Sequence, residues 1–473
     1  MGILGSEFLG IAPILSVTVL SLIVLIVEAL FRKSEKASFW ISFIGLPICG
    51  TISLGMIDLT GTVFHRMVTV GGFGCLLGTL FIISAWLTIT LAREYLLKEH
   101  ADFGEFYLLV LFALIGMMVI AAAADLIMIF LGIELMSVCL YVLAGFLRRR
   151  PISNESALKY FLLGAFATGF LLYGIALLYG ASGTTNIASL AAGFQALSTS
   201  GMFWVGIGLL IVGFAFKVGA VPFHMWIPDV YQGSPTPVSG FMSTGAKAAA
   251  FSAFVLVFAQ QQIGDGVKVR TVLSVLSAAS MILGNVIAVS QSNIKRMLAY
   301  SSVAHAGYML AGLAAGNALG RTGVIFYLVA YTFMNLGAFG VLALLEREEE
   351  KNLMFDDYAG LGFKRPMLAA LMSIFMISLA GIPPFAGFLG KYYVFAAAVN
   401  ANLTWLAIVG VMTSLISVYY YLRLVIVMYF QDGDTVVSSY SFLSIAVLVV
   451  AAAAVIDFGV FPSSLLTIIN SLY

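Results

Sequence analysis

The sequence predicts an all-α polytopic membrane protein with about 14 transmembrane helices. Three observations lead to this fold class. Of the 473 residues, 62% are hydrophobic and 10% are charged, and the mean hydropathy is +1.07, whereas soluble domains carry about 25% charged residues. Long apolar runs recur along the whole chain. Short motifs also repeat at a nearly constant spacing, which indicates an internal duplication.

The apolar runs define the elements in order, because a helix needs about 20 apolar residues to cross a bilayer. The first run, 8–31, follows Glu7 and is itself followed by Arg32 and Lys33, so we expect a retained helix and no cleaved signal peptide. The later helices are predicted at 39–58, 71–92, 105–122, 125–147, 157–180, 201–220, 237–260, 270–289, 297–315, 321–346, 367–399 (interrupted), 403–430 and 441–468.

The basic residues predict the orientation, because inner loops carry the excess of lysine and arginine. With the N-terminus outside, the inner loops hold 14 basic residues and the outer loops hold four. The inner set is Arg32, Lys33, Lys36, Arg93, Lys98, Arg148, Arg149, Arg150, Lys295, Arg296, Arg347, Lys351, Lys364 and Arg365, and the outer set is Arg66, Lys268, Arg270 and Arg321. We therefore expect a multi-pass protein of the cell inner (plasma) membrane with both termini on the outer, periplasmic side.

The second half of the chain resembles the first. The matches are GAVPF (219–223) with GIPPF (381–385), SV (137–138) with SV (302–303), and GIALL (174–178) with GVLAL (340–344), at offsets of 162, 165 and 166. Five helices thus map onto the next five, and an odd number of spans inverts the second copy, as in inverted-repeat transporters. The predicted segments are 1–104 with three helices, 105–266 and 267–430 as the two repeats, and 431–473 with the last helix.

Prolines predict discontinuous helices in both repeats. Six of the 11 prolines fall in the two matching regions: Pro222, Pro228, Pro235, Pro237, Pro383 and Pro384. A proline inside a helix removes a backbone hydrogen bond and bends the chain. We expect the seventh and twelfth helices to break at Pro222, Pro383 and Pro384. Transporters of this kind bind ions at such breaks, near the middle of the membrane.

Four of the ionisable residues inside predicted helices form the candidate site, and a charge at the centre of such a helix costs at least about 2.5–3.5 kcal/mol. They are Glu134 on the fifth helix, Lys217 on the seventh, Lys247 on the eighth and Lys391 just beyond the break in the twelfth. Burial lowers the pKa of an unpaired lysine and a nearby carboxylate raises it again. A glutamate–lysine pair whose separation changes can therefore take up and release a proton. A permanent ion pair is the alternative, but it does not account for three lysines against one glutamate.

Three further residues are predicted to assist. His224 and His305 can relay protons near neutral pH, with helix packing as the alternative role. Lys159, on the sixth helix, is expected to tune Glu134 or to collect protons at the inner face. We also expect Asp229 to orient the loop between the seventh and eighth helices.

Redox chemistry is not expected on this chain. Its three cysteines, Cys49, Cys75 and Cys139, are far apart and form no CxxC pair, and four histidines show no haem-ligand pairing. The sequence contains no GxGxxG and no phosphate-binding loop. The net charge of +1 gives no basic surface for nucleic acid. We therefore expect no cofactor and no metal on this chain.

Three stretches carry a family resemblance: HMWIPDVYQGSPTPVSGFMSTGAKAAAF (224–251), NIKRMLAYSSVAHAGYML (293–310) and GIPPFAGFLGK (381–391). They resemble the antiporter-like membrane subunits of respiratory complex I, most closely the N-type subunits, and the likeness extends over essentially the whole chain. Ser234 departs from the alanine expected in the GAPTP run. Lys391 stands where M-type subunits have glutamate, and the chain stops at Tyr473 without the lateral helix of L-type subunits, so both types are disfavoured.

The resemblance implies 14 helices, two inverted repeats and a proton-translocating role within a membrane arm beside other antiporter-like subunits. NADH, FMN, iron–sulfur clusters and quinone would then belong to partner subunits. It assigns proton translocation to Glu134, Lys217, Lys247 and Lys391, with Lys159 as an accessory. We expect Glu134 to hold Lys217, and a proton to pass through Lys247 and Lys391 to the outside.

Three alternatives share these features. One is a subunit of a multisubunit cation/proton antiporter, which sodium-dependent proton flux without quinone would favour. Another is a subunit of a membrane-bound hydrogenase, which the electron donor would distinguish. The last is a scaffold with an inactive channel.

Overall fold

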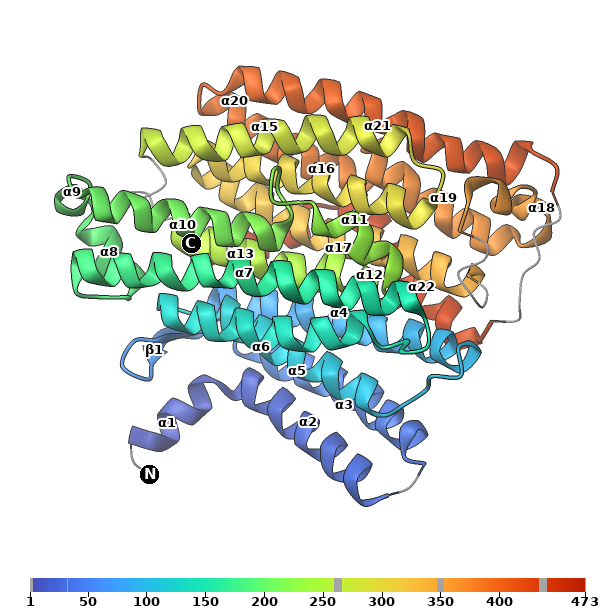
Figure 1. The fold of residues 1–473 in the computed structure, drawn as a ribbon, viewed down its shortest axis with the longest axis horizontal. Helices are drawn as coiled ribbons and strands as arrows, with labels where there is room; N and C mark the ends of the chain where they lie inside the picture. The colour runs from blue at the N-terminus through green and yellow to red at the C-terminus, as the bar shows by residue number, and fades with distance from the viewer. Residues whose placement is uncertain (1–2, 32, 259–265, 347–352, 434–439, 473) are drawn as a thin grey trace.

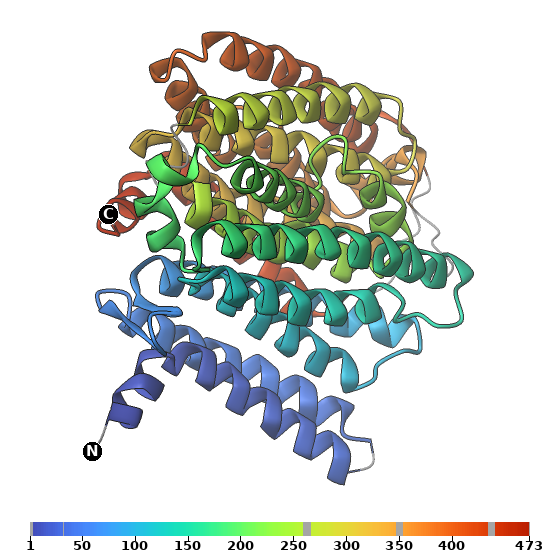
Figure 2. The ribbon, with the colours of Figure 1, turned by 60° about the vertical axis from the view of Figure 1, so that its left-hand side comes forward.

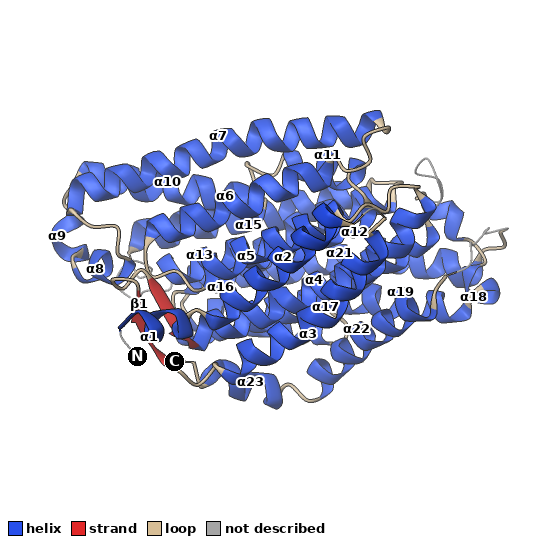
Figure 3. Ribbon diagram, turned by 90° about the horizontal axis from the view of Figure 1, so that it is seen from below, coloured by secondary structure: helices blue, strands red, loops and turns tan. Residues whose placement is uncertain are grey.

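The structure is a computed structural model that describes residues 3–31, 33–258, 266–346, 353–433 and 440–472, with only the backbone of 3–6. Arg32, Arg347 and Lys351 of the predicted inner loops lie outside the described residues. The chain forms an elongated bundle of roughly parallel helices, and both termini lie at the same end of it (Figures 1 and 3). In the described part, 11 helices are long and apolar enough to cross a membrane.

The N-terminal helices begin at one edge of the bundle. They are α1 (Ile3–Gly10), α2 (Ala12–Leu30), α3 (Glu35–Gly55) and α4 (Gly72–Lys98). Figure 2 shows α2 and α3 as an outer pair, and only 28% and 33% of their most apolar 18-residue windows are buried, against 89% for α4. Because α2 and α3 have few neighbours, their apolar surface is left for lipid or for another chain.

An antiparallel hairpin joins α3 to α4, and it was not predicted. Its strands are β1 (Thr60–Val63) and β2 (Val68–Gly71). Thr69 donates its backbone N–H to the Ala122 carbonyl at 2.7 Å, which fastens the hairpin to the end of α5. The sequence of so short a segment does not predict a hydrogen bond to a distant residue, so the hairpin could not be expected from it.

The first predicted repeat consists of α5 (Glu105–Ala121), α6 (Leu126–Ala144), α7 (Pro151–Ser182), α8 (Ile187–Ala192), α9 (Phe194–Leu197), α10 (Gly201–Val218), α11 (Trp226–Gly233), α12 (Thr236–Phe241), a π-helical turn η1 (Met242–Ala246) and α13 (Lys247–Phe258). Helices α12, η1 and α13 form one continuous rod, and 94% of its apolar window is buried. The short helices α8 and α9 were not predicted, because they are too short for an apolar period.

The second predicted repeat consists of α15 (Val267–Val289), α16 (Ile294–Ala315), α17 (Ala318–Leu345), a 3₁₀ turn η3 (Phe355–Tyr358), α18 (Leu361–Lys364), α19 (Pro366–Ala380), α20 (Ala386–Asn400) and α21 (Thr404–Phe430); α22 (Phe442–Val460) and α23 (Ser463–Asn470) follow. Helix α17 is the centre of the bundle, since its apolar window is 100% buried. Each predicted span has a helical counterpart. The last one is divided into α22 and α23, and the count of 14 spans stays a prediction.

Capping residues set several helix ends that the apolar pattern misplaced. Helix α16 begins at Ile294, three residues early, because the Asn293 side chain accepts the Arg296 N–H at 3.1 Å. Helix α7 begins at Pro151, where the fixed φ of proline suits the first turn. A capping asparagine and an N-terminal proline, both outside the apolar runs, therefore lengthen these helices.

Two helices are broken where the prolines predicted. Helix α10 ends at Gly219 and α19 ends at Gly381, and both glycines are left-handed, with φ of +74° and +83°. In each break the next N–H bonds back five residues: Ala220 to the Ala215 carbonyl at 2.8 Å, and Ile382 to the Ile377 carbonyl at 3.2 Å. The breaks match at the 162-residue offset, which confirms the discontinuous helices and supports the internal duplication.

We predict that Gly387→Ala destabilises the protein through the second break. A methyl group at Gly387 would lie 1.9 Å from the Ser378 carbonyl oxygen, so α20 must move away from α19. Overpacking of this kind costs about 1–3 kcal/mol. The thermal aggregation midpoint of the purified protein in detergent should fall. Gly208→Ala is the matched control, because nothing lies within 4 Å of its added methyl group; equal midpoints for the two variants would contradict the prediction.

Candidate functional site

The three predicted lysines are buried in the described structure. Lys217 lies in the last turn of α10, Lys247 at the start of α13 and Lys391 in α20, and they are 6%, 2% and 5% exposed. A buried ammonium group is costly unless it is hydrogen-bonded. The partners of each lysine therefore define the site.

Lys217 is held by hydroxyl groups of α6. Its Nζ donates to Ser137 Oγ at 2.8 Å and to Tyr141 OH at 3.4 Å. Glu134 precedes Ser137 by one turn, but in the described residues its carboxylate forms no ion pair within 4.0 Å. Its buried Oε1 has no hydrogen-bond partner there. The expected direct Glu134–Lys217 pair is thus not formed, because Ser137 takes the ammonium group instead.

Lys247 is positioned by a π-helical turn and bound by α16. The turn η1 ends immediately before it, and one inserted residue of this kind redirects the side chains that follow. The Lys247 ammonium donates to the Ser302 carbonyl at 2.6 Å and also to the Ser302 hydroxyl. Lysine and partner therefore come from different predicted repeats.

Lys391 binds backbone carbonyls at the break in the twelfth predicted span. Its Nζ donates to the Leu379 and Ala380 carbonyls at 3.0 and 2.8 Å, and to Ser414 Oγ at 2.8 Å. Leu379 and Ala380 end α19, where the carbonyls lack helical partners and carry partial negative charge. The Lys391 Nζ also lies 5.1 Å from the centroid of the Tyr308 ring. The break thus supplies the acceptors that make a buried lysine tolerable.

His305 lies between Lys247 and Lys391 along α16. Ser302, which binds Lys247, and Tyr308, which faces Lys391, are about 9 Å apart along the helix, with His305 midway. His305 Nδ1 bonds to Tyr327 OH at 2.7 Å and Nε2 to Tyr421 OH at 3.0 Å. Its position agrees with the predicted relay, and its satisfied nitrogens also agree with a packing role.

Several polar residues near these lysines were not predicted. Asn285 donates to Tyr308 OH at 2.9 Å and accepts from Tyr420 OH at 2.9 Å, and Tyr421 also bonds to Ser301. Asn285 lies inside an apolar run, so its polarity alone could have identified it as a candidate site residue. The tyrosines gave no such signal, since aromatic residues are frequent throughout this chain.

Lys159 belongs to a different group of charges. Its Nζ pairs with Glu155 at 2.7 Å and with Asp229 at 2.8 Å, and Asp229 also binds Arg296 at 2.9 Å. Lys159 therefore contacts these carboxylates rather than Glu134, and its side chain is 41% exposed. Asp229 lies in α11, not in a loop, and it ties α11 to α7 and α16.

His224 lies in the break between α10 and α11. The residue is 8% exposed, and its Nδ1 has no hydrogen-bond partner in the described part of the chain. The predicted break residues Pro222, Pro383 and Pro384 occupy the two interruptions, at 219–225 and 381–385. The structure does not join His224 to the group around His305.

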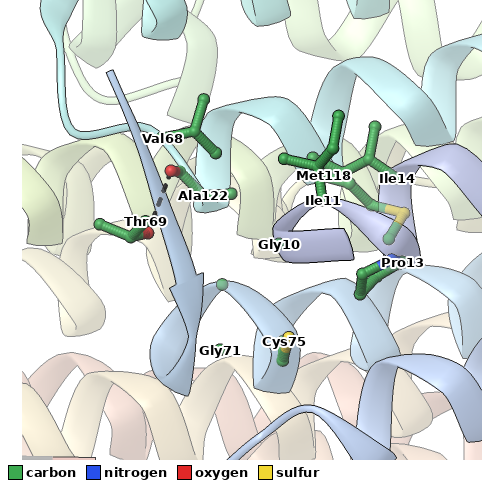
Figure 4. Close-up of a pocket in the computed structure, with 11 residues that line it drawn as sticks. Gly10, Ile11, Pro13, Ile14, Val68, Thr69, Gly71, Cys75, Met118 and Ala122 are labelled. Atoms are coloured by element: carbon green, nitrogen blue, oxygen red, sulfur yellow. Dashed lines mark hydrogen bonds between the residues drawn. The ribbon is translucent and has the colours of Figure 1, made fainter. Parts of the chain in front are cut away.

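A cavity of about 710 Å³ lies between α20 and α21 and reaches Lys391 and Ser414. Its other lining is mostly apolar. A much smaller pocket, of about 20 Å³, lies among the α1–α2 turn, β2, α4 and α5, with Pro13 and Cys75 in its lining (Figure 4). The three lysines do not line this second pocket, so of these two cavities the larger one reaches the site.

The fold and the site define a class: a polytopic α-helical membrane protein with two broken helices and buried lysines beside or near the breaks. Residues 123–417 match the family model "NADH:quinone oxidoreductase/Mrp antiporter, TM". The chain belongs to this family. It is 46% identical to NADH-quinone oxidoreductase subunit N of Trichlorobacter lovleyi, over 96% of this chain and 95% of the relative. It is 45% identical to the subunit N of Salinibacter ruber, over 92% and 90%.

Solved structures share the fold. A chain of respiratory complex I from Thermus thermophilus is 33% identical, with a TM-score of 0.84 over 96% of this chain and 98% of that one. A chain of the Mrp complex from Dietzia superposes with a TM-score of 0.85 at 22% identity, over 98% and 96%. The second likeness shows the fold alone.

We predict that Tyr421→Phe destabilises the protein. The change removes the hydroxyl that meets both Ser301 and His305, and leaves buried polar atoms without a partner, at a cost of about 1–3 kcal/mol. The thermal aggregation midpoint should fall. Tyr419→Phe, on the same helix with a side chain 60% exposed, should leave it unchanged. If both variants behave like the parent, the Tyr421 hydroxyl does not support His305.

Proposed function

We propose that this chain is a proton-translocating, antiporter-like subunit of the membrane arm of a complex I-type NADH–quinone oxidoreductase. The observation that carries the proposal is the set of three buried lysines, of which Lys247 and Lys391 contact Ser302 and Tyr308 of α16, with His305 between these two positions along the helix. The chain would take part in the translocase without redox chemistry of its own. NADH, FMN, iron–sulfur clusters and quinone would be held by partner subunits.

Each lysine is bound in a way that suits proton transfer. Lys217, Lys247 and Lys391 each donate to a serine hydroxyl, and hydroxyls can both accept and donate. An ammonium held by neutral acceptors is less strongly stabilised than one in an ion pair, so it can release its proton when the surroundings change. Permanent ion pairs would oppose this release.

Glu134 would control the first lysine. Its carboxylate lies one turn from Ser137, the acceptor of Lys217, and has no ion pair in the described structure. A small movement would exchange the Ser137 acceptor for the Glu134 carboxylate and strengthen proton binding at Lys217. We propose that quinone chemistry in a neighbouring subunit drives this exchange.

The proton would enter from the inner side at Lys217, pass to Lys247 and leave outward from Lys391. Lys247 binds Ser302 and Lys391 lies beside the Tyr308 ring, so both contact α16, whereas Lys217 is hydrogen-bonded to α6. We therefore propose that the Lys217–Lys247 step is the gated one. Lys159 and His224 would assist at the margins of this route.

The proposed setting is the inner membrane of a bacterium, with both termini on the periplasmic side and other antiporter-like subunits as neighbours. The proposed segments are 1–104, 105–266, 267–430 and 431–473, with the middle two as inverted repeats. The matching breaks at Gly219 and Gly381 support this division.

A cation/proton antiporter subunit is the second candidate function, and the fold shared with a chain of the Mrp complex favours it. The electron donor would separate both candidates from a hydrogenase subunit.

Tagging the chain and purifying it in mild detergent tests whether it belongs to a complex I-type assembly. A particle several times the 50.6 kDa of the chain, with NADH-driven quinone reduction, is expected. A small particle without redox activity would exclude the complex I setting.

We predict that Lys217→Ala abolishes or strongly reduces the proton translocation that this chain contributes. The change removes the ammonium that Ser137 and Glu134 would share. The measurement is the ratio of protons moved to quinone reduced, in vesicles that contain the assembled complex. Lys268→Ala is the control, because Lys268 is exposed and stacks on Trp204 at 4.5 Å. An unchanged ratio and rate in Lys217→Ala would refute the assignment.

A further inference from the structure

A buried carboxylate at the end of α17 has no part in the route above. The Glu346 side chain is 0% exposed. Tyr95 OH donates to its Oε1 at 3.1 Å, and Thr236 donates its hydroxyl to Oε2. Arg150 Nη1 lies 3.8 Å from Oε1. Burying a carboxylate in this way costs free energy, so its presence at this position needs a physical explanation.

The Arg150 side of Glu346 leads to the surface. A cavity of about 370 Å³ at this end of the bundle is lined in part by Glu99 and Arg150. Arg150 Nη2 donates to Glu99 Oε2 at 2.6 Å, and the two side chains are 15% and 9% exposed. One arginine therefore separates the buried Glu346 carboxylate from a polar, open cavity.

The Thr236 side of Glu346 leads toward Lys247. Thr236 is the first residue of α12, and hydroxyls follow at Ser239 and Ser243 before Lys247. Steps of three and four residues keep Thr236, Ser239 and Ser243 on one helical face, and the π-helical turn η1 then lies between Ser243 and Lys247. All three hydroxyl residues are 0% exposed. Thr236 donates to Glu346, and Ser239 and Ser243 donate to the Tyr231 and Gly240 carbonyls, so these buried hydroxyls form a row about one turn apart between Glu346 and the lysine.

Helix α17 lines the same row with polar groups. Asn335 Nδ2 donates to Ser243 Oγ at 2.7 Å, and Tyr331 lies one turn earlier on the same face. In the described residues, Asn335 Oδ1 and the Tyr331 and Tyr231 hydroxyls are buried without a hydrogen-bond partner. Buried polar atoms of this kind are normally bound to water, and water would extend the row to Lys247.

A purely structural ion pair accounts poorly for Glu346. Arg150 makes its short contact, 2.6 Å, to Glu99 and leaves Glu346 at 3.8 Å. The Glu346 oxygens are bound instead by the hydroxyls of Tyr95 and Thr236, which can pass a proton. A carboxyl group between a polar cavity and a hydroxyl row has the geometry of a proton carrier.

We propose that Glu346 is the proton-uptake group for Lys247. The carboxylate accepts a proton from water of the Glu99–Arg150 cavity to form the neutral acid, and then donates a proton through the Thr236 hydroxyl row to neutral Lys247, returning to the carboxylate. This inference rests on the proposed proton translocation. It places one uptake route at the end of the bundle where α17 and α4 end and α12 begins.

The test compares variants in vesicles that hold the assembled complex. Glu346→Gln keeps the size and the acceptor for Thr236 but cannot carry a proton, so the number of protons contributed by this chain should fall. Thr236→Val, which removes the hydroxyl, should cause the same loss, and Thr236→Ser, which restores it, should recover translocation. Glu94→Gln is the control, because Glu94 lies at the same end but pairs with Lys98 at 3.7 Å.

Two further readouts separate the outcomes. Native gels report assembly, and infrared difference spectra during turnover should show a carboxylic acid band that Glu346→Gln lacks. Normal translocation in an assembled Glu346→Gln complex, with loss in Lys247→Ala, overturns the uptake role alone. Normal translocation in both refutes the proposed function as well. If Glu346→Gln does not assemble, equal translocation by Thr236→Val and Thr236→Ser overturns the uptake role.

Discussion

The need to hydrogen-bond every buried ammonium group governs this structure. A lysine in a membrane-spanning bundle is tolerated only where acceptors replace water, and a regular helix has none to spare. The breaks after Gly219 and Gly381 release carbonyls, and Lys391 binds two of those at the end of α19. The broken helix is therefore the condition under which this lysine can be buried.

Helix α16 is the second organising element, because it connects charges that other helices carry. Ser302 receives Lys247 from α13, His305 meets Tyr327 of α17 and Tyr421 of α21, and Tyr308 faces Lys391 of α20. Neutral acceptors hold each ammonium without fixing its proton. Such an arrangement gives up some stability for groups that can change their charge, which is what proton transfer requires.

The charged pairs around Asp229 work differently. Asp229 pairs with Lys159 at 2.8 Å and with Arg296 at 2.9 Å, and all three side chains are partly exposed, so they join α7, α11 and α16 as ordinary ion pairs. Glu346 differs from them, since it is fully buried and its closest partners are hydroxyls. Burial and the type of partner, more than charge alone, separate groups that hold the bundle together from groups suited to carry protons.

The sequence by itself determined the helical membrane fold, the two breaks and the buried lysines, since apolar runs, prolines and isolated charges are local signals. Tertiary structure alone decided the partners. Ser137 takes Lys217 in place of Glu134, Lys159 turns to Asp229, and Glu346 reaches Thr236 from 110 residues away. The hairpin at 60–71 was likewise set by its bond to Ala122. Hydrogen bonds between distant segments depend on how helices pack, and no local pattern of residues records that packing.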